Sequence, residues 1–360
     1  MGKSLFDVFS LGSLHLQNRI VMAPLTRARA TAEHVPTDLM VTYYRQRATA
    51  GLIVTEGTSP SPDGVGYARI PGLYTQEQVV AWRKVTNAVH EQGGRIFVQL
   101  MHTGRVSHPL NMPSEARIVA PSAVALSGTM WTDQQGMQPY PIPAAMTEAD
   151  ISHAIEQFST SAALAIEAGF DGVELHGANG YLIDQFFNTA SNLRTDQWGG
   201  AIENRARFAV NVAKAVSARI GAARTGIRLS PYGAFNDTLP DADMDALYEH
   251  LAKEFSKLGL AYIHLVDHYS MGAPEVPESV KYIIRENFRG TIILSGGYDG
   301  TRAATDLSAN KGDLVAFGKP ILANPDFVQR LRKGIPLAQP DPATFYTPGE
   351  KGYTDYPAAN

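Results

Sequence analysis

The six residues His176-Gly-Ala-Asn-Gly-Tyr181 bring an imidazole, a carboxamide and a phenol into one short segment. They directly follow the apolar run Gly172-Val-Glu-Leu175, which predicts a short buried strand, and their two glycines predict a turn. His and Asn side chains can both donate hydrogen bonds to one oxygen, while a Tyr hydroxyl carries a transferable proton. The segment therefore predicts a site that polarises a carbonyl group and delivers a proton beside it.

Eight short apolar runs recur along the chain and predict the strands that must position such a site. They are Ile20–Ala23, Leu52–Thr55, Ile96–Leu100, Val173–Leu175, Gly226–Leu229, Tyr262–Val266, Thr291–Leu294 and Leu314–Phe317. Helical patterns lie between them, and one begins with a capping box formed by Thr75 and Gln78. Regular alternation of strand and helix predicts parallel strands joined by crossover helices.

Eight such units close into a (β/α)₈ TIM barrel, which we predict as a single domain spanning residues 1–360. The rival is an open doubly wound sheet, which usually has a glycine-rich turn after its first strand. Here that turn reads Ala23-Pro-Leu-Thr26 and contains no glycine, which favours the barrel.

Two segments fall outside the repeating units. Residues 1–19 show short apolar alternation and predict a hairpin that closes the barrel floor. Residues 103–146 form a long proline-rich insertion after the third strand, and they include Trp131 and Tyr140. Long loops in compact domains are more often functional than accidental, so we expect a lid or subdomain over the barrel mouth. The alternative is a surface excursion without a role in function.

Catalytic side chains of such barrels come from the C-terminal ends of the strands. The seventh and eighth strands are followed by Ser295-Gly-Gly297 and Gly318-Lys319. Glycine turns expose backbone N–H groups and lysine adds a positive charge, so this pair of turns predicts a phosphate site. The C-terminal ends of the other strands also carry polar residues, within the strand or just after it, namely Thr26, Glu56, Gln99, His102, His176, Arg228, His264 and Asp267.

Composition argues against several other functions. The formal net charge is −4 without a Lys/Arg block, so we expect no nucleic-acid partner. Cysteine is absent, which excludes disulfides and thiolate chemistry and fits a cytoplasmic location. No stretch has the length of a membrane span, and the first residues lack the apolar core of a signal peptide.

Metal and glycosidase chemistry find little support in the residue pattern. Metal ligands could come from His102, His108, His176, His264 and His268, but no carboxylate pair accompanies them at a diagnostic spacing, and we predict no metal site. Glycoside hydrolysis needs two carboxylates at strand ends, for which Glu56 and Asp267 are the only clear candidates.

The sequence resembles the Old Yellow Enzyme family of FMN-dependent ene-reductases. The resemblance extends from Asn18-Arg-Ile-Val-Met-Ala-Pro-Leu-Thr-Arg27 to Gly352-Tyr-Thr-Asp-Tyr-Pro357. It is strongest in His176-Gly-Ala-Asn-Gly-Tyr-Leu-Ile-Asp-Gln-Phe186 and in Asn192-Leu-Arg-Thr-Asp-Gln-Trp-Gly-Gly200 followed by Ile202-Glu-Asn-Arg205. Long motifs in the same order, at nearly all the predicted strand ends, make coincidence an inadequate explanation.

The resemblance implies a tight, non-covalent FMN across the barrel mouth. The residues that it implies around the cofactor are Pro24, Leu25, Thr26, Gly57, Gln99, Arg228, Gly297, Gly318 and Lys319. Of these, Thr26 would donate its hydroxyl to the flavin O4, while Gln99 and Arg228 would meet the pyrimidine edge, where a guanidinium stabilises the reduced ring. Gly297, Gly318 and Lys319 would hold the phosphate of FMN, in agreement with the phosphate site predicted from the two glycine turns.

The resemblance also implies roles above the flavin. His176 and Asn179 would bind the carbonyl oxygen of an activated alkene, and hydride would reach the β-carbon. Tyr181 would then protonate the α-carbon. NADPH or NADH would serve as the reductant, and the protein would be a monomer or a homodimer. The further residues expected to contact substrate are Tyr67, Tyr353 and Met101.

The chain departs from the family pattern at two of these positions. Lys319 stands where relatives usually have Arg, so the phosphate loses a bidentate partner. Met101 replaces a Trp that many relatives carry, which should enlarge or soften the pocket. Two other functions remain open: reduction of nitroaromatics or nitrate esters within the same family, and a flavin-free lyase or isomerase acting on a phosphorylated metabolite.

Overall fold

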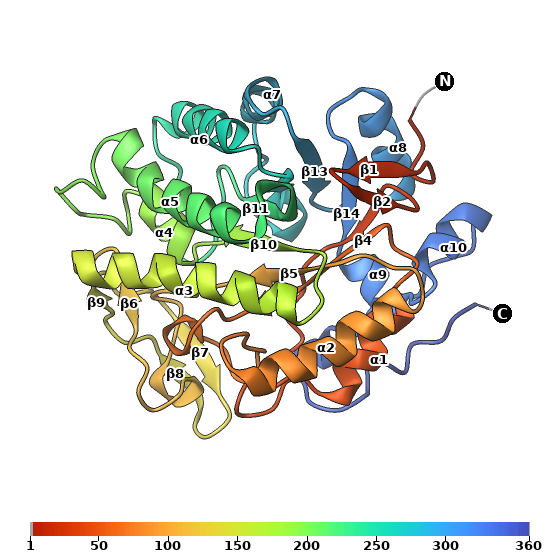
Figure 1. Ribbon diagram of the computed structural model, residues 1–360, viewed down its shortest axis with the longest axis horizontal. Helices are drawn as coiled ribbons and strands as arrows, with labels where there is room; N and C mark the ends of the chain where they lie inside the picture. Colours follow the sequence, from red (N-terminus) through yellow and green to blue (C-terminus); the bar gives the residue numbers. More distant parts are fainter. Residues whose placement is uncertain (1–2, 360) are drawn as a thin grey trace.

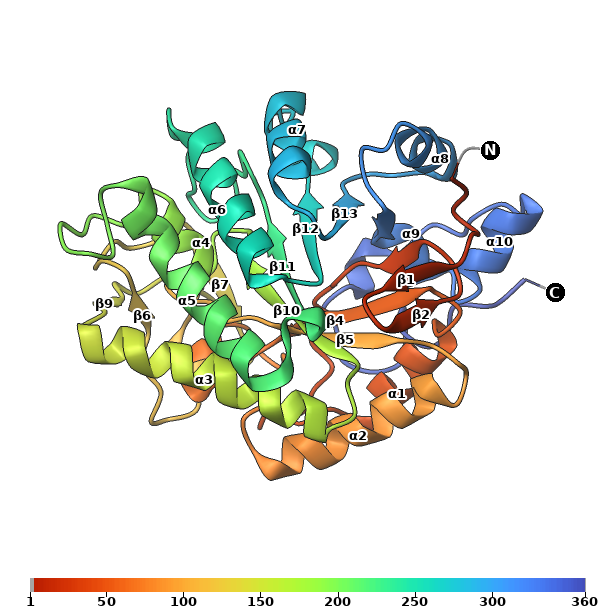
Figure 2. The same cartoon turned by 45° about the horizontal axis from the view of Figure 1, so that its top comes forward.

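Eight parallel strands close into a barrel at the centre of the molecule (Figures 1 and 2). The computed structural model describes residues 3–359. The barrel strands are β3 (Ile20–Met22), β4 (Leu52–Thr58), β5 (Ile96–Leu100), β10 (Gly172–Gly177), β11 (Thr225–Leu229), β12 (Tyr262–Val266), β13 (Thr291–Ser295) and β14 (Leu314–Phe317). Pairing of β14 with β3 closes the ring. Each strand coincides with one of the predicted apolar runs, so the TIM barrel is confirmed.

Helices surround the barrel on its outside (Figure 1). They are α1 (Asp38–Gln46), α2 (Gln76–His90), α3 (Glu148–Glu167), α4 (Leu182–Phe187), α5 (Ile202–Ile220), α6 (Met244–Leu258), α7 (Glu278–Asn287), α8 (Gly300–Ser308), α9 (Lys319–Ala323) and α10 (Phe327–Lys333). The capping box predicted at Thr75 and Gln78 is present at the start of α2. None of the helices within residues 3–359 is both long and apolar enough to cross a membrane.

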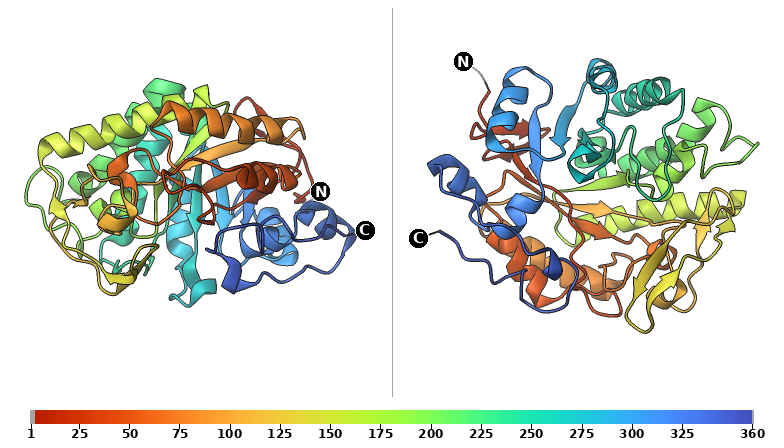
Figure 3. Two further views of the ribbon diagram at one scale, coloured as in Figure 1. Left: turned by 90° about the horizontal axis from the view of Figure 1, so that it is seen from below. Right: turned by 180° about the vertical axis from the view of Figure 1, so that it is seen from behind.

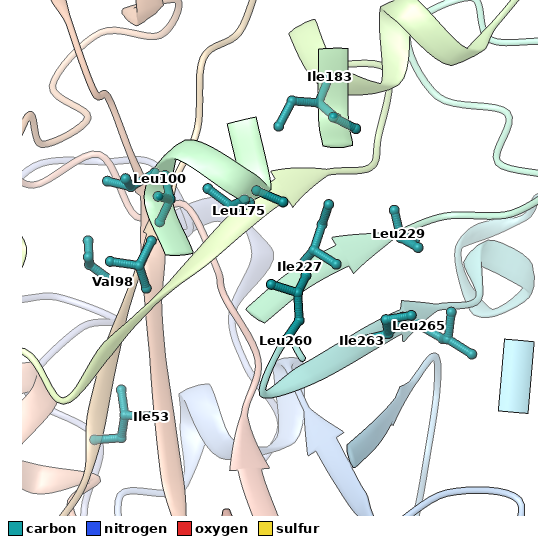
Figure 4. Packing of buried hydrophobic residues seen from close by; sticks show 14 of the residues in the cluster. Ile53, Val98, Leu100, Leu175, Ile183, Ile227, Leu229, Leu260, Ile263 and Leu265 are labelled. Carbon is teal, nitrogen blue, oxygen red and sulfur yellow. The ribbon is translucent and has the colours of Figure 1, made fainter. Parts of the chain in front are cut away.

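Aliphatic side chains fill the layer between the strands and the helices. Figure 4 shows Val98, Leu175, Ile227 and Ile263 on successive strands, all of them fully buried. Because the helices cover the outer surface of the barrel, strands β5, β10, β11 and β12 are buried throughout their length. This rigid frame fixes the positions of the residues at the strand ends.

The hairpin predicted before the first barrel strand is confirmed. It consists of β1 (Phe9–Leu11) and β2 (Leu14–Leu16), which pair antiparallel. Leu11 and Leu16 are buried in one cluster with Val21 and Phe97 of the barrel interior. The hairpin therefore closes the barrel at the end opposite to the C-terminal strand ends.

The insertion between β5 and α3 contains short strands of its own. They are β6 (Val119–Ala120), β7 (Thr129–Thr132), β8 (Gly136–Pro139) and β9 (Ala144–Ala145), with β7 and β8 forming a hairpin seen in yellow in Figure 3. Apolar residues of the insertion, including Leu126 and Met130, form a separate cluster with Met101 and Tyr181. The insertion thus packs against residues of the barrel mouth.

Candidate active site

A cavity of about 530 Å³ opens at the C-terminal ends of the barrel strands. Its lining contains all the residues that the sequence predicted around FMN, together with Met101, His176, Asn179 and Tyr181. Residues contributed by strands that are far apart in the sequence therefore meet in one place, as the barrel prediction requires.

The turn after β10 orients the first group of polar side chains. The strand continues through His176 to Gly177, two residues beyond the predicted end, and His176 is paired in register with Arg228. Asn179 adopts a positive φ of 61°, and its backbone N–H donates to the Ser230 hydroxyl over 2.9 Å. Asn tolerates this left-handed conformation better than most residues, which explains why the turn can project a carboxamide into the cavity.

His176 is a neutral imidazole in this environment. Burial and the positive charge of Arg228 lower the pKa of His176 well below its ordinary value of 6.5. Its Nδ1 is buried without a hydrogen-bond partner, and the ring packs edge-on against Tyr181 with centroids 4.9 Å apart. A neutral imidazole keeps one N–H donor, so it can hydrogen-bond to an oxygen without bringing a net charge.

His268, in the 3₁₀ turn His268–Met271 after β12, fixes the orientation of the Asn179 carboxamide. The His268 Nε2 lies 2.8 Å from the Asn179 Oδ1. Burial and the nearby Arg228 lower the pKa of His268 to about 4, so the ring is neutral and its Nε2 carries the proton shared with that oxygen. This arrangement leaves the Asn179 amino group to donate to a ligand. The sequence had suggested His268 only as one of several histidines able to bind a metal.

Tyr181 pairs with Tyr67 at the edge of the cavity. Their hydroxyl oxygens lie 3.0 Å apart. Burial raises the pKa of Tyr181 to about 12, although the hydrogen bond from Tyr67 acts in the opposite direction. Tyr181 therefore stays protonated across the whole range in which the protein would be studied.

A buried carboxylate lies inside the barrel beneath the cavity. Glu174 accepts hydrogen bonds from Gln99 Nε2 over 2.8 Å and from His264 Nδ1 over 2.9 Å. Burial alone would raise the pKa of Glu174, but its contacts with His264, Arg228 and Gln99 outweigh burial and hold the pKa below its ordinary value. The carboxylate thus fixes Gln99 and balances the charge of Arg228. Nothing in the apolar run around Glu174 had indicated this role.

The pair of residues considered for glycoside hydrolysis does not form. Glu56 points away from the cavity, where its side chain accepts hydrogen bonds from the backbone of Arg27 and the hydroxyl of Tyr44. Asp267 lines the cavity and forms an ion pair with Lys281 over 3.0 Å. Among residues 3–359, no group of three or more His, Asp and Glu side chains is placed to hold a metal ion.

The structure does not bring Tyr353 to the cavity. This ring is fully buried and stacks on Tyr43 with centroids 4.1 Å apart, while the Arg29 guanidinium lies over it. The expectation that Tyr353 contacts substrate is therefore corrected. Tyr346, which the sequence did not single out, lines the cavity instead.

Met101 lies at the cavity wall against Gly57. It is buried, lines the cavity and packs so closely on Gly57 that a Cβ added there would lie 2.4 Å from the Met101 sulfur. A side chain at residue 57 would therefore displace Met101, which explains the glycine at this strand end.

Comparisons with known proteins agree with this geometry. Residues 4–338 match the model of the NADH:flavin oxidoreductase / NADH oxidase family. The chain belongs to this family. A probable flavin mononucleotide-dependent alkene reductase from Leishmania infantum is 44% identical over 353 residues, which cover 96% of this chain and 95% of the relative.

Solved structures show the same relationship. A structure of morphinone reductase is 44% identical, with a TM-score of 0.96 and coverage of 100% of this chain and 97% of that chain. A second one, in complex with tetrahydroNAD, has a TM-score of 0.94 at 44% identity and covers 99% and 98%. The Old Yellow Enzyme homologue from Zymomonas mobilis is 39% identical, with a TM-score of 0.95 and coverage of 99% and 100%. The resemblance drawn from the sequence is thereby confirmed, and the protein is an FMN-dependent oxidoreductase.

The residues around the cavity fit FMN. The Arg228 Nε is buried without a hydrogen-bond partner, as expected of a donor whose acceptor is a bound ligand. Gly297 adopts a positive φ of 63°, while Gly296 lies so close to the Asp267 backbone that a Cβ would come within 2.5 Å of its oxygen. The chain therefore makes a side-chain-free turn beside Gly318 and Lys319, where backbone N–H groups can approach a phosphate.

Proposed function

We propose that the protein is an ene-reductase that uses NADPH or NADH to reduce the C=C bond of α,β-unsaturated carbonyl compounds or similarly activated alkenes. The observation that supports this most directly is the convergence of two neutral donors, on His176 and Asn179, with the protonated phenol of Tyr181 in one cavity. That set of groups suits a substrate whose oxygen gains negative charge while one of its carbons gains a proton.

The cofactor would be held by the residues predicted from the sequence. Gln99 and Arg228 would bind the pyrimidine edge, and Gly297, Gly318 and Lys319 the phosphate. When bound, FMN would accept hydride from a reduced nicotinamide and donate hydride to an alkene. Glu174 would keep the Gln99 side chain oriented toward the flavin ring. One carboxylate oxygen of Glu174 accepts a hydrogen bond from Gln99, and the other is fixed by His264.

His176 and Asn179 would hold the carbonyl oxygen of the alkene. As negative charge develops on that oxygen, two preorganised donors stabilise it more than they stabilise the neutral ground state. A neutral imidazole suits this role because it donates without protonating the oxygen outright. Tyr181, on the opposite side of the bound alkene, would transfer its proton to the α-carbon, and Tyr67 would stabilise the phenolate that remains.

The two substrates would use the same cavity in turn. Morphinone reductase was solved in complex with tetrahydroNAD, and its fold coincides with that of this chain. One cavity that must admit both a nicotinamide and an alkene predicts ping-pong kinetics. We expect the purified protein to be yellow, and double-reciprocal plots of rate against alkene at several NADPH or NADH concentrations to be parallel.

The alternative within the family is reduction of nitro compounds or nitrate esters, because the same donors could bind a nitro oxygen. Measuring the turnover of cyclohexenone and of a nitrate ester by the same enzyme separates the two functions. A protein that takes up FMN but reduces only the nitrate ester would contradict the alkene assignment. The flavin-free lyase or isomerase left open by the sequence does not agree with membership of the NADH:flavin oxidoreductase / NADH oxidase family.

His268 offers a test of the oxygen-binding pair. His268→Leu removes the donor that orients the Asn179 carboxamide, so the affinity for a phenol, which mimics the enolate oxygen, should fall about two- to tenfold. His268→Gln keeps a donor and should recover most of the loss. Both affinities are measured from the change in flavin absorbance on titration.

His153→Leu, on the exposed surface of α3, is the matched control and should leave the affinity unchanged. If His268→Leu binds the phenol as tightly as the wild type does, the orientation of Asn179 does not depend on this hydrogen bond.

A further inference from the structure

A second cavity of about 720 Å³ adjoins the first. The two share Thr26, Tyr181 and Tyr346 in their linings, so the second begins where the proposed proton donor stands. Its other residues come from the chain around Tyr67, from the β7–β8 hairpin of the insertion and from the C-terminal segment, and they include Arg69, Trp131 and Asp133.

The walls of the second cavity are mostly aromatic and aliphatic. Tyr67, Trp131, Tyr140 and Tyr346 contribute rings from three separate segments. Trp131 is 56% exposed and Tyr346 is 62% exposed, although both are large apolar side chains. Exposed aromatic groups gathered at the rim of a cavity are typical of a binding surface.

The only charged residues in this lining neutralise each other. Arg69 forms an ion pair with Asp133, and its other nitrogens donate to the backbone oxygens of Ala28 over 3.2 Å and Tyr346 over 3.1 Å. Asp133 also accepts a hydrogen bond from the Trp131 indole over 3.0 Å. Partial burial works against ionisation of Asp133, but these hydrogen bonds outweigh it and hold its pKa below the ordinary value.

We propose that the second cavity binds an uncharged, apolar extension of the alkene substrate, and that Asp133 rejects anionic extensions by masking Arg69. The proposal rests on the function proposed above and names the class of substrate: enones with a hydrophobic ring or chain beyond the carbonyl. A carboxylate or phosphate that entered this cavity would meet the negative charge of Asp133 beside the guanidinium of Arg69. It would give up its hydration without gaining an unpaired cation as a partner.

The insertion gains a function from this arrangement. Met130, Trp131 and Asp133 all lie on the β7–β8 hairpin or directly after β7, so the hairpin supplies both an apolar wall and the masking charge. Its packing against Met101 and Tyr181 places that wall next to the proposed catalytic groups. The insertion would thus act as a selectivity wall rather than as a decorative loop.

Three cyclohexenones test the proposal: the parent compound, one with a phenylalkyl tail, and one with a carboxyalkyl tail of the same length. The measured quantity is kcat/KM for each tailed compound divided by kcat/KM for the parent, in the FMN-loaded enzyme. The wild type should favour the phenylalkyl compound by about tenfold, from the apolar area that the tail buries. It should not favour the carboxyalkyl compound.

Two substitutions should change these ratios in different directions. Trp131→Ala should lower the phenylalkyl ratio about fivefold, because it removes one wall. Asp133→Asn keeps the shape but unmasks Arg69, so the carboxyalkyl ratio should rise about tenfold, and the gain should shrink at high salt. Gln135→Ala, at an exposed position in the same hairpin, should change neither ratio.

The outcomes separate the two proposals. If the parent cyclohexenone is reduced but all ratios stay near one in every variant, the second cavity binds no substrate extension and this inference is wrong. If the wild type already favours the carboxyalkyl tail, the masking role of Asp133 is wrong. If the parent compound is not reduced at all, the proposed function itself fails. Thermal unfolding of Asp133→Asn shows whether the hairpin contact was needed for folding. If it was, Arg69→Met, which removes the masked cation instead of the masking carboxylate, should leave the phenylalkyl preference intact.

Discussion

Replacing Tyr181 with Phe should slow the reduction of an enone by about 10²- to 10⁴-fold, the usual contribution of a positioned general acid. The substitution removes the hydroxyl that lies 3.0 Å from the Tyr67 hydroxyl, while the ring that packs against His176 stays in place. The measurement is the rate at which enone reoxidises the pre-reduced enzyme under anaerobic conditions in a stopped-flow instrument.

The companion half-reaction supplies the control. Reduction of the enzyme by NADPH or NADH requires no proton from Tyr181, so its rate should change little in Tyr181→Phe. Tyr67→Phe, which removes the partner hydroxyl but leaves the proposed donor, should slow enone reduction much less. An equal loss in both half-reactions of Tyr181→Phe would mean that the phenol shapes the cavity instead of donating a proton.

The pH dependence follows from the same burial. Tyr181 must be protonated to act, and its pKa of about 12 means that this form is lost only as the pH rises toward that value. His176 is already neutral at pH 7, because its pKa lies well below 6.5. The rate of enone reduction should therefore stay nearly constant from about pH 6 to about pH 10. A rate that falls through neutral pH would show that another group supplies the proton.

Much of the fold could be predicted because the barrel strands are buried on both sides. Each strand is then an apolar run without alternation, and helices with clear start signals, such as the capping box at Thr75, separate the runs. The segment from His176 to Tyr181 was visible for a related reason. Its glycines end the strand and its polar residues follow immediately, so the local sequence alone indicated a turn that carries chemistry.

The residues that the sequence did not reveal act through neighbours that are distant in the chain. His268 contacts Asn179 only because β10 and β12 both end at the barrel mouth. Glu174 sits in an apolar run, and only closure of the barrel brings Gln99 and His264 to its two oxygens. A local pattern carries no information about such contacts.

The exchange of Tyr353 for Tyr346 has a similar cause. Both tyrosines lie in one C-terminal segment, and their spacing in the sequence does not indicate which ring lies at the cavity and which is buried in the core. Tyr353 is held in the core by stacking on Tyr43 and by the cation of Arg29, which leaves Tyr346 at the cavity rim. The buried arginines around Tyr353 therefore determine which tyrosine is available to a ligand.

Neutral histidines beside a charge-balanced arginine give the site its chemical character. His176 and His268 are both kept neutral by burial and by the charge of Arg228. The charge of Arg228 is in turn balanced by Glu174 from below. In the proposed function, a substrate oxygen would meet the neutral donors of His176 and Asn179, so it could gain negative charge during the reaction without being protonated.

His176→Ala should therefore lower the rate of enone reduction by about 10²- to 10³-fold, the cost of removing one donor from a preorganised oxyanion site. It should also weaken the binding of a phenol, measured by flavin absorbance, because the anionic oxygen of that ligand would be left with Asn179 alone. The FMN content of the variant serves as the control, since the proposed FMN contacts do not include His176.

The double variant with Asn179→Ala determines whether the two donors act on the same atom. Donors that share one oxygen are coupled, so the second substitution should cost much less in the His176→Ala background than in the wild type. Independent, additive losses would place the two side chains on different parts of the substrate. That result would mean that the turn does not form a two-donor site for a single oxygen, although each side chain would still contribute to the reaction.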